Sequence, residues 1–138
     1  MPAKRQNSLT ILERLRTAGL RPTRQRLALA KILFAAGDRH VTAEGLFNEA
    51  KARRVKVSLA TIYNALHDFT ESGLLREIAI EAERSYFDTN VTDHHHFYFE
   101  DSRELQDLPL DQVRIASLPA APKGGRISRV DVVIRVAS

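Results

Sequence analysis

The chain has 138 residues, of which 43% are apolar and 28% are charged, and its formal net charge is +4. This composition is that of a soluble protein forming one compact unit or two small ones. No stretch approaches the roughly 20 apolar residues of a membrane span. The basic N-terminus lacks the apolar segment of a signal peptide. We therefore expect a cytoplasmic protein with no membrane partner.

The chain contains no cysteine. This absence excludes disulfides, thiolate zinc sites and thiol redox sensing. Any transition metal must therefore be held by histidine, carboxylate, tyrosine or water.

The charge is unevenly distributed along the chain. Residues 1–87 carry 15 Lys and Arg against 9 Asp and Glu, whereas residues 88–138 carry 6 against 8. A basic first part suggests a polyanionic partner for that part alone. A solvated charged surface explains the same numbers, so charge by itself does not decide between the two.

The first part of the chain predicts helices punctuated by glycine, followed by a β-hairpin. Helical leucine spacing and hydroxyl N-caps mark the helices, and a polar turn at Glu81–Arg84 marks the hairpin. The expected elements are helices at 8–18 and 24–36, a helix capped by Thr42, a helix at Ser58–Gly73 and two strands within 74–88.

The fourth helix carries the strongest functional pattern of this part. Its apolar residues form a narrow stripe, and its opposite face bears short side chains with Tyr63 at the flank. Helices followed by a hairpin fit a winged helix-turn-helix, whose last helix enters the DNA major groove. A helical domain with no nucleic-acid role fits the same order. Basic residues flanking this helix are candidates for phosphate contacts: Arg21, Arg24, Arg26, Lys51, Arg53, Arg54 and Lys56.

The second part of the chain alternates as strands do. His94, His96 and Tyr98 share one face of a strand, while His95 and Phe97 face the other way. Residues 105–113 suggest a short helix. Residues 127–136 form the clearest strand pattern, and a strand of this kind near a C-terminus invites pairing with a second subunit.

Two histidines two residues apart on a strand point to the same side, which is a common start for a metal site. Asp88 and Asp107 are the nearby carboxylates in sequence. Imidazole and carboxylate together suit Fe(II), Mn(II) or Zn(II) better than Cu(I). A surface strand with polar outward residues explains the pair equally well at this point.

The motif order resembles a known family. The segments "GLRPTRQRLALAKIL", "HVTAEGLF", "SLATIYNAL", "GLLREI" and "YFDTNVTDHHHFYFED" follow one another between about Leu12 and Val136, and this order resembles the ferric uptake regulator (Fur) superfamily. The resemblance implies an α+β fold. It places a winged helix-turn-helix DNA-binding domain at residues 1–88 and a small αβ dimerisation and sensing domain at residues 89–138.

The resemblance also implies roles for particular residues. It implies a metal or haem site at the hinge between the two domains, with His95 as a possible additional ligand and with the ligands His40, Asp88, His94, His96 and Asp107. The family's DNA contacts fall on Arg21 and Tyr63. Together with candidates chosen for their position near the reading helix, the predicted DNA-binding residues are Arg21, Arg24, Ser58, Thr61, Tyr63 and Asn64.

Two departures from the family pattern refine these expectations. The paired cysteines of the family's structural tetrathiolate zinc site are absent, so that zinc is not expected. The histidine cluster and the ending at 127–136 look most like the iron response regulator (Irr) branch, whose members sense iron through haem. Some members carry a Cys-Pro haem motif, which this chain lacks, so haem would need His or Tyr ligands.

The leading hypothesis is therefore a transcriptional repressor, not an enzyme, that binds operators when iron is low and is released by haem. The alternative within the same class is a repressor that needs Fe(II) or Mn(II) at the hinge, or that senses peroxide there. A non-haem iron enzyme and a DNA binder that senses nothing are more remote. A symmetric homodimer or a higher oligomer would read an AT-rich inverted repeat in double-stranded DNA.

Overall fold

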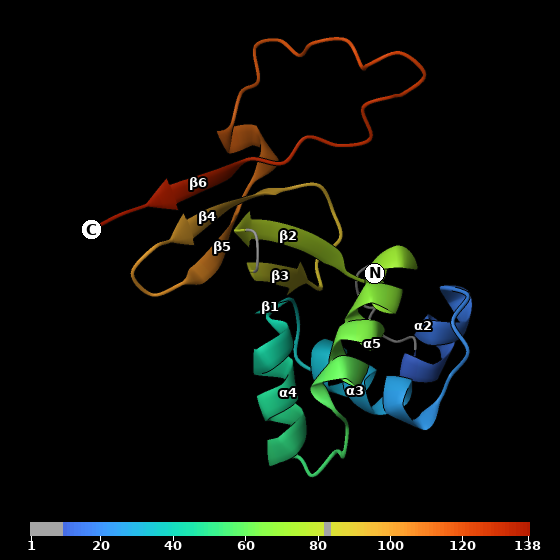
Figure 1. The fold of residues 1–138 in the computed structure, drawn as a ribbon. Coiled ribbons are helices and arrows are strands. Elements are labelled where there is room, and N and C mark those ends of the chain that lie inside the picture. Colours follow the sequence, from blue (N-terminus) through green and yellow to red (C-terminus); the bar gives the residue numbers. More distant parts are fainter. Residues whose placement is uncertain (1–9, 82–83) are drawn as a thin grey trace. The chain divides into compact units, whose positions relative to one another are not determined.

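The computed structural model describes residues 10–81 and 84–138. The chain divides into two compact units, Met1–Val91 and Thr92–Ser138, which we call unit 1 and unit 2. The predicted domain boundary followed residue 88, close to this division. Figure 1 labels the elements of both units.

Among the described residues, unit 1 contains four helices. They are α2 (Ile11–Thr17), α3 (Arg24–Phe34), α4 (Ala43–Ala52) and α5 (Leu59–Glu71). Three of them begin within one residue of the predicted start, whereas the first, expected from residue 8, begins at Ile11. The side-chain oxygen of each N-cap accepts a hydrogen bond from the backbone N–H three residues later, which satisfies a donor that the helix itself leaves unpaired. These N-caps are Thr10, Thr23, Thr42 and Ser58. The predicted first two positions of α2, residues 8 and 9, lie outside the described residues.

Glycines end two of these helices in the expected way. Gly19 follows α2 with φ of +82°, and Gly73 follows α5 with φ of +85°. Side chains with a Cβ rarely adopt this left-handed conformation, so glycine lets the chain turn away at no steric cost.

The core of unit 1 forms where the apolar faces of its helices meet. Leu33 of α3, Leu46 of α4 and Phe69 of α5 are fully buried, and Val41 and Phe87 bring the neighbouring strands into the same cluster. Burial of a side chain of this size contributes about 2 kcal/mol each. This core fixes the orientation of α5 and thereby decides which of its residues face solvent.

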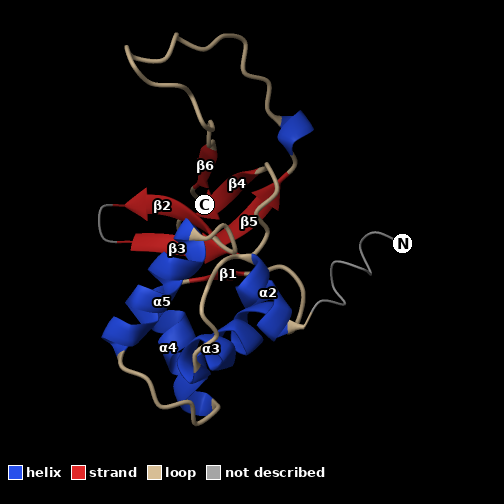
Figure 2. Ribbon diagram, turned by 90° about the vertical axis from the view of Figure 1, so that its right-hand side faces the viewer, coloured by secondary structure: helices blue, strands red, loops and turns tan. Residues whose placement is uncertain are grey.

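A three-stranded antiparallel sheet completes unit 1. Its strands are β1 (His40–Val41), β2 (Arg76–Glu81) and β3 (Arg84–Asp88), in the order β1-β3-β2. The predicted hairpin is β2 with β3, and the residues at its turn, 82 and 83, are not described. Figure 2 shows these strands in red and the helices in blue. Helices α4 and α5 followed by this hairpin have the order of a winged helix-turn-helix, and the predicted α+β class is confirmed.

Unit 2 is a second three-stranded sheet. It contains β4 (His95–Phe99), β5 (Glu104–Leu108) and β6 (Val133–Val136), in the order β5-β4-β6. Strand β5 runs antiparallel to β4, whereas β6 runs parallel to it. Its helical content among the described residues is one 3-10 turn, η1 (Leu110–Gln112).

Two sequence expectations for unit 2 need correction. The helix expected over 105–113 is not continuous, because residues 105–108 pair with β4 as strand and only residues 110–112 form the turn η1. The strand expected over 127–136 is limited to its last four residues. Strand β4 begins at His95, and the register His96↔Val133 leaves the residues before β6 without strand partners. Residues 113–132 therefore run without helix or strand.

No helix among residues 10–81 and 84–138 is both long and apolar enough to cross a membrane.

Candidate metal ligands and nucleic-acid interface

Unit 1 brings together two of the predicted metal ligands. His40 opens β1 and Asp88 ends β3, and the two residues are directly paired in the sheet register. The His40 Nε2 atom lies 3.2 Å from Asp88 Oδ2. Asp88 is completely buried, and a buried carboxylate is costly unless charged or polar partners surround it.

The backbone around Asp88 fixes the orientation of its carboxylate. The backbone N–H of Asn90 donates a hydrogen bond of 2.9 Å to Asp88 Oδ1. This bond occupies one oxygen and turns Oδ2 toward His40. An oriented carboxylate oxygen beside an imidazole nitrogen is a pair of donors that fits a metal ion.

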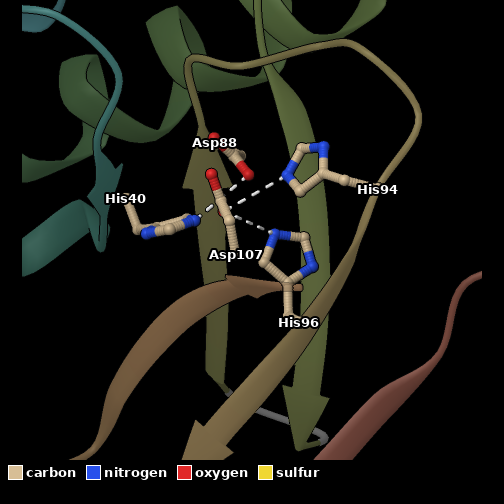
Figure 3. A group of neighbouring side chains, drawn as sticks. All are labelled: His40, Asp88, His94, His96 and Asp107. Carbon is tan, nitrogen blue, oxygen red and sulfur yellow. Dashed lines mark ion pairs between the residues drawn. The ribbon is translucent and has the colours of Figure 1, made fainter. Parts of the chain in front are cut away.

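Unit 2 brings together the other three predicted ligands. Strand β4 is paired with β5 so that His96 lies opposite Asp107. The Asp107 Oδ1 atom lies 3.3 Å from His94 Nε2 and 3.5 Å from His96 Nε2. Figure 3 shows both imidazoles directed at this carboxylate, and it also draws the His40–Asp88 pair of unit 1.

His94 is held in the orientation that a ligand needs. Its Nδ1 atom lies 2.6 Å from the carbonyl oxygen of Thr92. A carbonyl oxygen only accepts, so Nδ1 carries the proton, and in the neutral ring Nε2 presents its lone pair toward Asp107. Metal-binding histidines are commonly oriented by such a bond from the other ring nitrogen.

His95 has a different place from its two neighbours. The backbone N–H of Val132 donates to His95 Nδ1 at 3.1 Å, so this nitrogen is already occupied. The side chain is 3% exposed and belongs to the opposite strand face from His94 and His96. The bond ties the segment before β6 to β4, which gives His95 a structural role and no support as an additional ligand.

The five candidate ligands share one kind of chemistry. Each offers either an imidazole nitrogen or a carboxylate oxygen, and the chain supplies no thiolate. Nitrogen and oxygen donors of this kind fit Fe(II), Mn(II) or Zn(II) and fit poorly with Cu(I). The residues present therefore suit a divalent ion.

Helix α5 exposes the face that the sequence assigns to DNA. Ile62, Leu66 and Phe69 are buried, so the opposite side of the helix faces solvent. Tyr63 is 47% exposed there, and Asn64 is also exposed. Polar and aromatic side chains on an exposed helix that precedes a hairpin have the form of a major-groove reader.

The other predicted DNA-binding residues lie around the start of α3 and of α5. Arg21 precedes α3 and Arg24 is its first residue, and both are exposed. Ser58 caps α5, with its Oγ accepting from the backbone N–H of Thr61 at 3.1 Å. The hydroxyls of Ser58 and Thr61 are also 3.0 Å apart. Ser58 therefore caps α5, and its bond to the Thr61 N–H orders the first turn of this helix.

Glu44 is the residue that sequence reasoning missed. It lies in the first turn of α4, and its Oε1 accepts a hydrogen bond of 2.7 Å from the Tyr63 hydroxyl. This bond lowers the pKa of Glu44, with a smaller effect of Arg84 in the same direction, and it raises the pKa of Tyr63. The two residues are 19 positions apart on different helices, so no local sequence pattern predicts the contact.

The chain is similar to known proteins over most of its length. The model of the ferric uptake regulator family matches residues 17–133. The peroxide operon regulator of Bacillus subtilis is 33% identical over 120 residues, covering 85% of this chain and 81% of that protein. The peroxide-responsive repressor PerR of Staphylococcus epidermidis is 32% identical over 99 residues, covering 72% of this chain and 65% of that protein.

Solved structures show the same fold. The ferric uptake regulator of Pseudomonas aeruginosa, solved with manganese, superposes with a TM-score of 0.72 at 23% identity, covering 94% of this chain and 98% of that one. The ferric uptake regulator of Vibrio cholerae gives the same TM-score at 20% identity, with coverages of 92% and 98%.

Proposed function

Because the chain belongs to the ferric uptake regulator family, we propose that it is a transcription repressor whose hold on operator DNA depends on a divalent metal ion. The observation that carries the proposal is the convergence of His94 and His96 on one oxygen of Asp107 in unit 2. The His40–Asp88 pair within unit 1 supports it. Both groups consist of nitrogen and oxygen donors only, which suits Mn(II), Fe(II) or Zn(II).

The five residues would hold one ion together. His40 and Asp88 come from the sheet of unit 1, and His94, His96 and Asp107 come from the sheet of unit 2. An ion bound by all five would neutralise the two carboxylates and link the two units. Such a link acts as a switch only if the ion binds the DNA-competent arrangement more tightly than the other arrangement.

Unit 1 would read the operator. Helix α5 would enter the major groove with Tyr63 and Asn64 toward base edges, while Arg21 and Arg24 would contact phosphates. A homodimer would place two such helices on an inverted repeat with half-sites about one helical turn apart. Because phosphates supply much of the affinity, binding should fall steeply with added salt.

The test is operator binding by the purified chain, titrated separately with Mn(II) and with haemin at fixed salt. The probe is a pool of AT-rich inverted repeats. We expect weak binding without metal and about 5- to 150-fold tighter binding with Mn(II), as a coupling of about 1–3 kcal/mol implies. Tight binding without metal that haemin abolishes would overturn this proposal in favour of a haem-released repressor.

A matched pair of variants locates the effect. His96→Ala should remove the response to Mn(II) while leaving the metal-free affinity unchanged. His67→Ala is the control, because His67 is an exposed histidine of α5 that is paired with Glu71 and lies outside both ligand groups. Loss of the Mn(II) response in the His67 variant, with retention in the His96 variant, would contradict the assignment.

Peroxide sensing at the same residues is a second candidate. Two of the similar proteins are a peroxide operon regulator and a peroxide-responsive repressor, and Asp88 occupies the position where the resemblance places aspartate in that branch. The chain has no thiol to oxidise, so one of the ligand histidines, His40, His94 or His96, would be the oxidised group. Peroxide added to the Fe(II)-loaded protein should then add one oxygen atom to a ligand histidine, and the Mn(II)-loaded protein should stay unmodified.

A further inference from the structure

Tyr63 is the exposed tyrosine of α5, and its hydroxyl proton is already used in a hydrogen bond. The Tyr63 Oη atom donates to Glu44 Oε1 at 2.7 Å. A bond from a neutral hydroxyl to an ionised carboxylate is charge-assisted and is stronger than a bond between neutral groups. Glu44 comes from α4, the helix before the turn, so the two helices of the motif share one polar pair.

The pair has no hydrogen-bond donor left for a further partner. A phenol has one O–H donor, and that donor faces Glu44, so Tyr63 Oη offers only lone pairs to a further partner. An ionised carboxylate has no donor at all, so Glu44 Oε2 likewise only accepts. The same hydrogen bond lowers the pKa of Glu44 and raises the pKa of Tyr63, so both shifts favour an ionised Glu44 and a neutral Tyr63.

The bases differ in whether their major-groove edges can bond with a pair that only accepts hydrogen bonds. Adenine and cytosine present an exocyclic amino group, which donates, whereas guanine and thymine present carbonyl oxygens, which accept. An acceptor-only pair bonds with the amino bases. Facing guanine O6 or thymine O4, it places oxygen against oxygen unless Tyr63 turns its hydroxyl away and leaves the Glu44 charge unpaired, which is costly away from water.

We propose that Glu44 is a specificity-determining residue that fixes Tyr63 as a hydrogen-bond acceptor, so that the pair selects adenine or cytosine over guanine or thymine at one position of the contacted strand. This inference rests on the proposed operator binding. Glu44 lowers affinity for DNA in general, because its charge repels phosphates, and it raises discrimination at that one position.

The experiment measures binding of the Mn(II)-loaded protein to the best operator from the pool and to every single-base substitution in one half-site. For the wild type, one position should show about tenfold discrimination of amino from carbonyl bases, the scale of one hydrogen bond made or opposed. Replacing adenine there with purine, which lacks the amino group, should cause a similar loss.

Variants test which side chain is responsible. Glu44→Ala frees the Tyr63 hydroxyl to donate, so discrimination at that position should fall to about twofold or less while binding to random DNA stays equal or tightens. Tyr63→Phe should abolish the effect of the purine replacement, and adding Glu44→Ala to it should change the base preference no further. Glu71→Ala is the charge control, because it removes a carboxylate from α5 that does not contact Tyr63.

The outcomes separate the two proposals. Specific binding with an unchanged base preference in Glu44→Ala overturns this inference and leaves the proposed function standing. A wild type that binds every sequence in the pool equally overturns the proposed function itself. Helix content and thermal midpoint of Glu44→Ala, measured by circular dichroism, must match the wild type, and Glu44→Gln, which keeps an acceptor, should retain part of the discrimination.

Discussion

Unit 1 and unit 2 bury their apolar side chains to very different extents. Unit 1 holds one cluster of buried apolar residues drawn from four helices and two strands. In the described part of unit 2, the buried apolar side chains are Tyr98 and Leu108. Large apolar side chains in unit 2 instead reach solvent, namely Leu110, Ile115, Leu118, Ile127 and Ile134.

The difference indicates where each unit obtains its stability. A core such as that of unit 1 suffices for a small domain, whereas a three-stranded sheet with few buried side chains is marginal alone. We therefore expect unit 2 to depend on a second copy of the chain, which would cover exposed apolar residues near β6. The predictions below test this contrast, beginning with the largest effect.

Truncating the core of unit 1 should be the most damaging change. Phe69→Ala removes a fully buried aromatic side chain and should lower the free energy of unfolding by about 3–5 kcal/mol. Urea denaturation followed by circular dichroism measures this loss. Phe97→Ala, at a half-buried position of β4, should cost clearly less, and equal losses would show that the two units are similarly packed.

Charging the exposed edge of unit 2 should separate the protomers. Ile134 of β6 is 39% exposed, and Ile134→Asp would bury an unpaired charge in a covered interface. We expect dimer dissociation to become about 100-fold easier, measured by sedimentation equilibrium. Ile115→Asp, outside the strands, is the control. A monomeric wild type would remove the contrast that motivates the experiment.

Carboxylate variants test whether the two units bind metal jointly. Asp88→Asn in unit 1 and Asp107→Asn in unit 2 should each weaken Mn(II) binding at least about tenfold, because each removes a charged ligand. Calorimetric titration gives both affinities. An effect confined to the Asp107 variant would mean that unit 2 binds the ion without unit 1.

Removing a helix cap in unit 1 should have a moderate effect. The Thr42 side chain accepts from the Gly45 backbone N–H at 3.0 Å, and Thr42→Ala should cost about 1 kcal/mol of stability. Thr42→Ser keeps the acceptor and should stay close to the wild type. Thermal unfolding of both variants compares them directly, and an equal loss in the serine variant would assign the effect to the missing methyl group.

The smallest expected effect is a local titration in unit 1. Tyr63→Phe removes the hydrogen bond that lowers the pKa of Glu44, so this pKa should rise toward its usual range. Carbon-detected NMR titration of the Glu44 carboxyl in both proteins measures the change. An unchanged value would mean that the Tyr63–Glu44 bond is not populated in solution.

The helices of unit 1 were predictable because their signals are local. Each cap is a Ser or Thr directly before an apolar period, and each bonds three residues ahead. The metal-ligand assignment came from the family resemblance, and it remains a prediction that the structure supports within each unit. The pairing of His96 with Asp107 across β4 and β5 depends on strand register, which local sequence does not determine.

The incorrect sequence-based predictions concern features that depend on residues far apart in the sequence. The segment 104–108 has no intrinsic preference that excludes a helix, and pairing with β4 makes it a strand. Strand β6 is short because β4 ends the available pairing, so residues 127–132 follow an apolar pattern without forming a ladder. Glu44 was missed because its partner lies on another helix.

The alternation along β4 makes this segment intolerant of a change in length. His94 and His96 face Asp107, while His95 between them accepts a bond from the chain before β6. Deleting one residue between His94 and His96 would move the side chains on one side of the deletion to the opposite strand face. Related chains that keep the same chemistry should therefore keep the length of this run and place their insertions elsewhere, such as between 113 and 132.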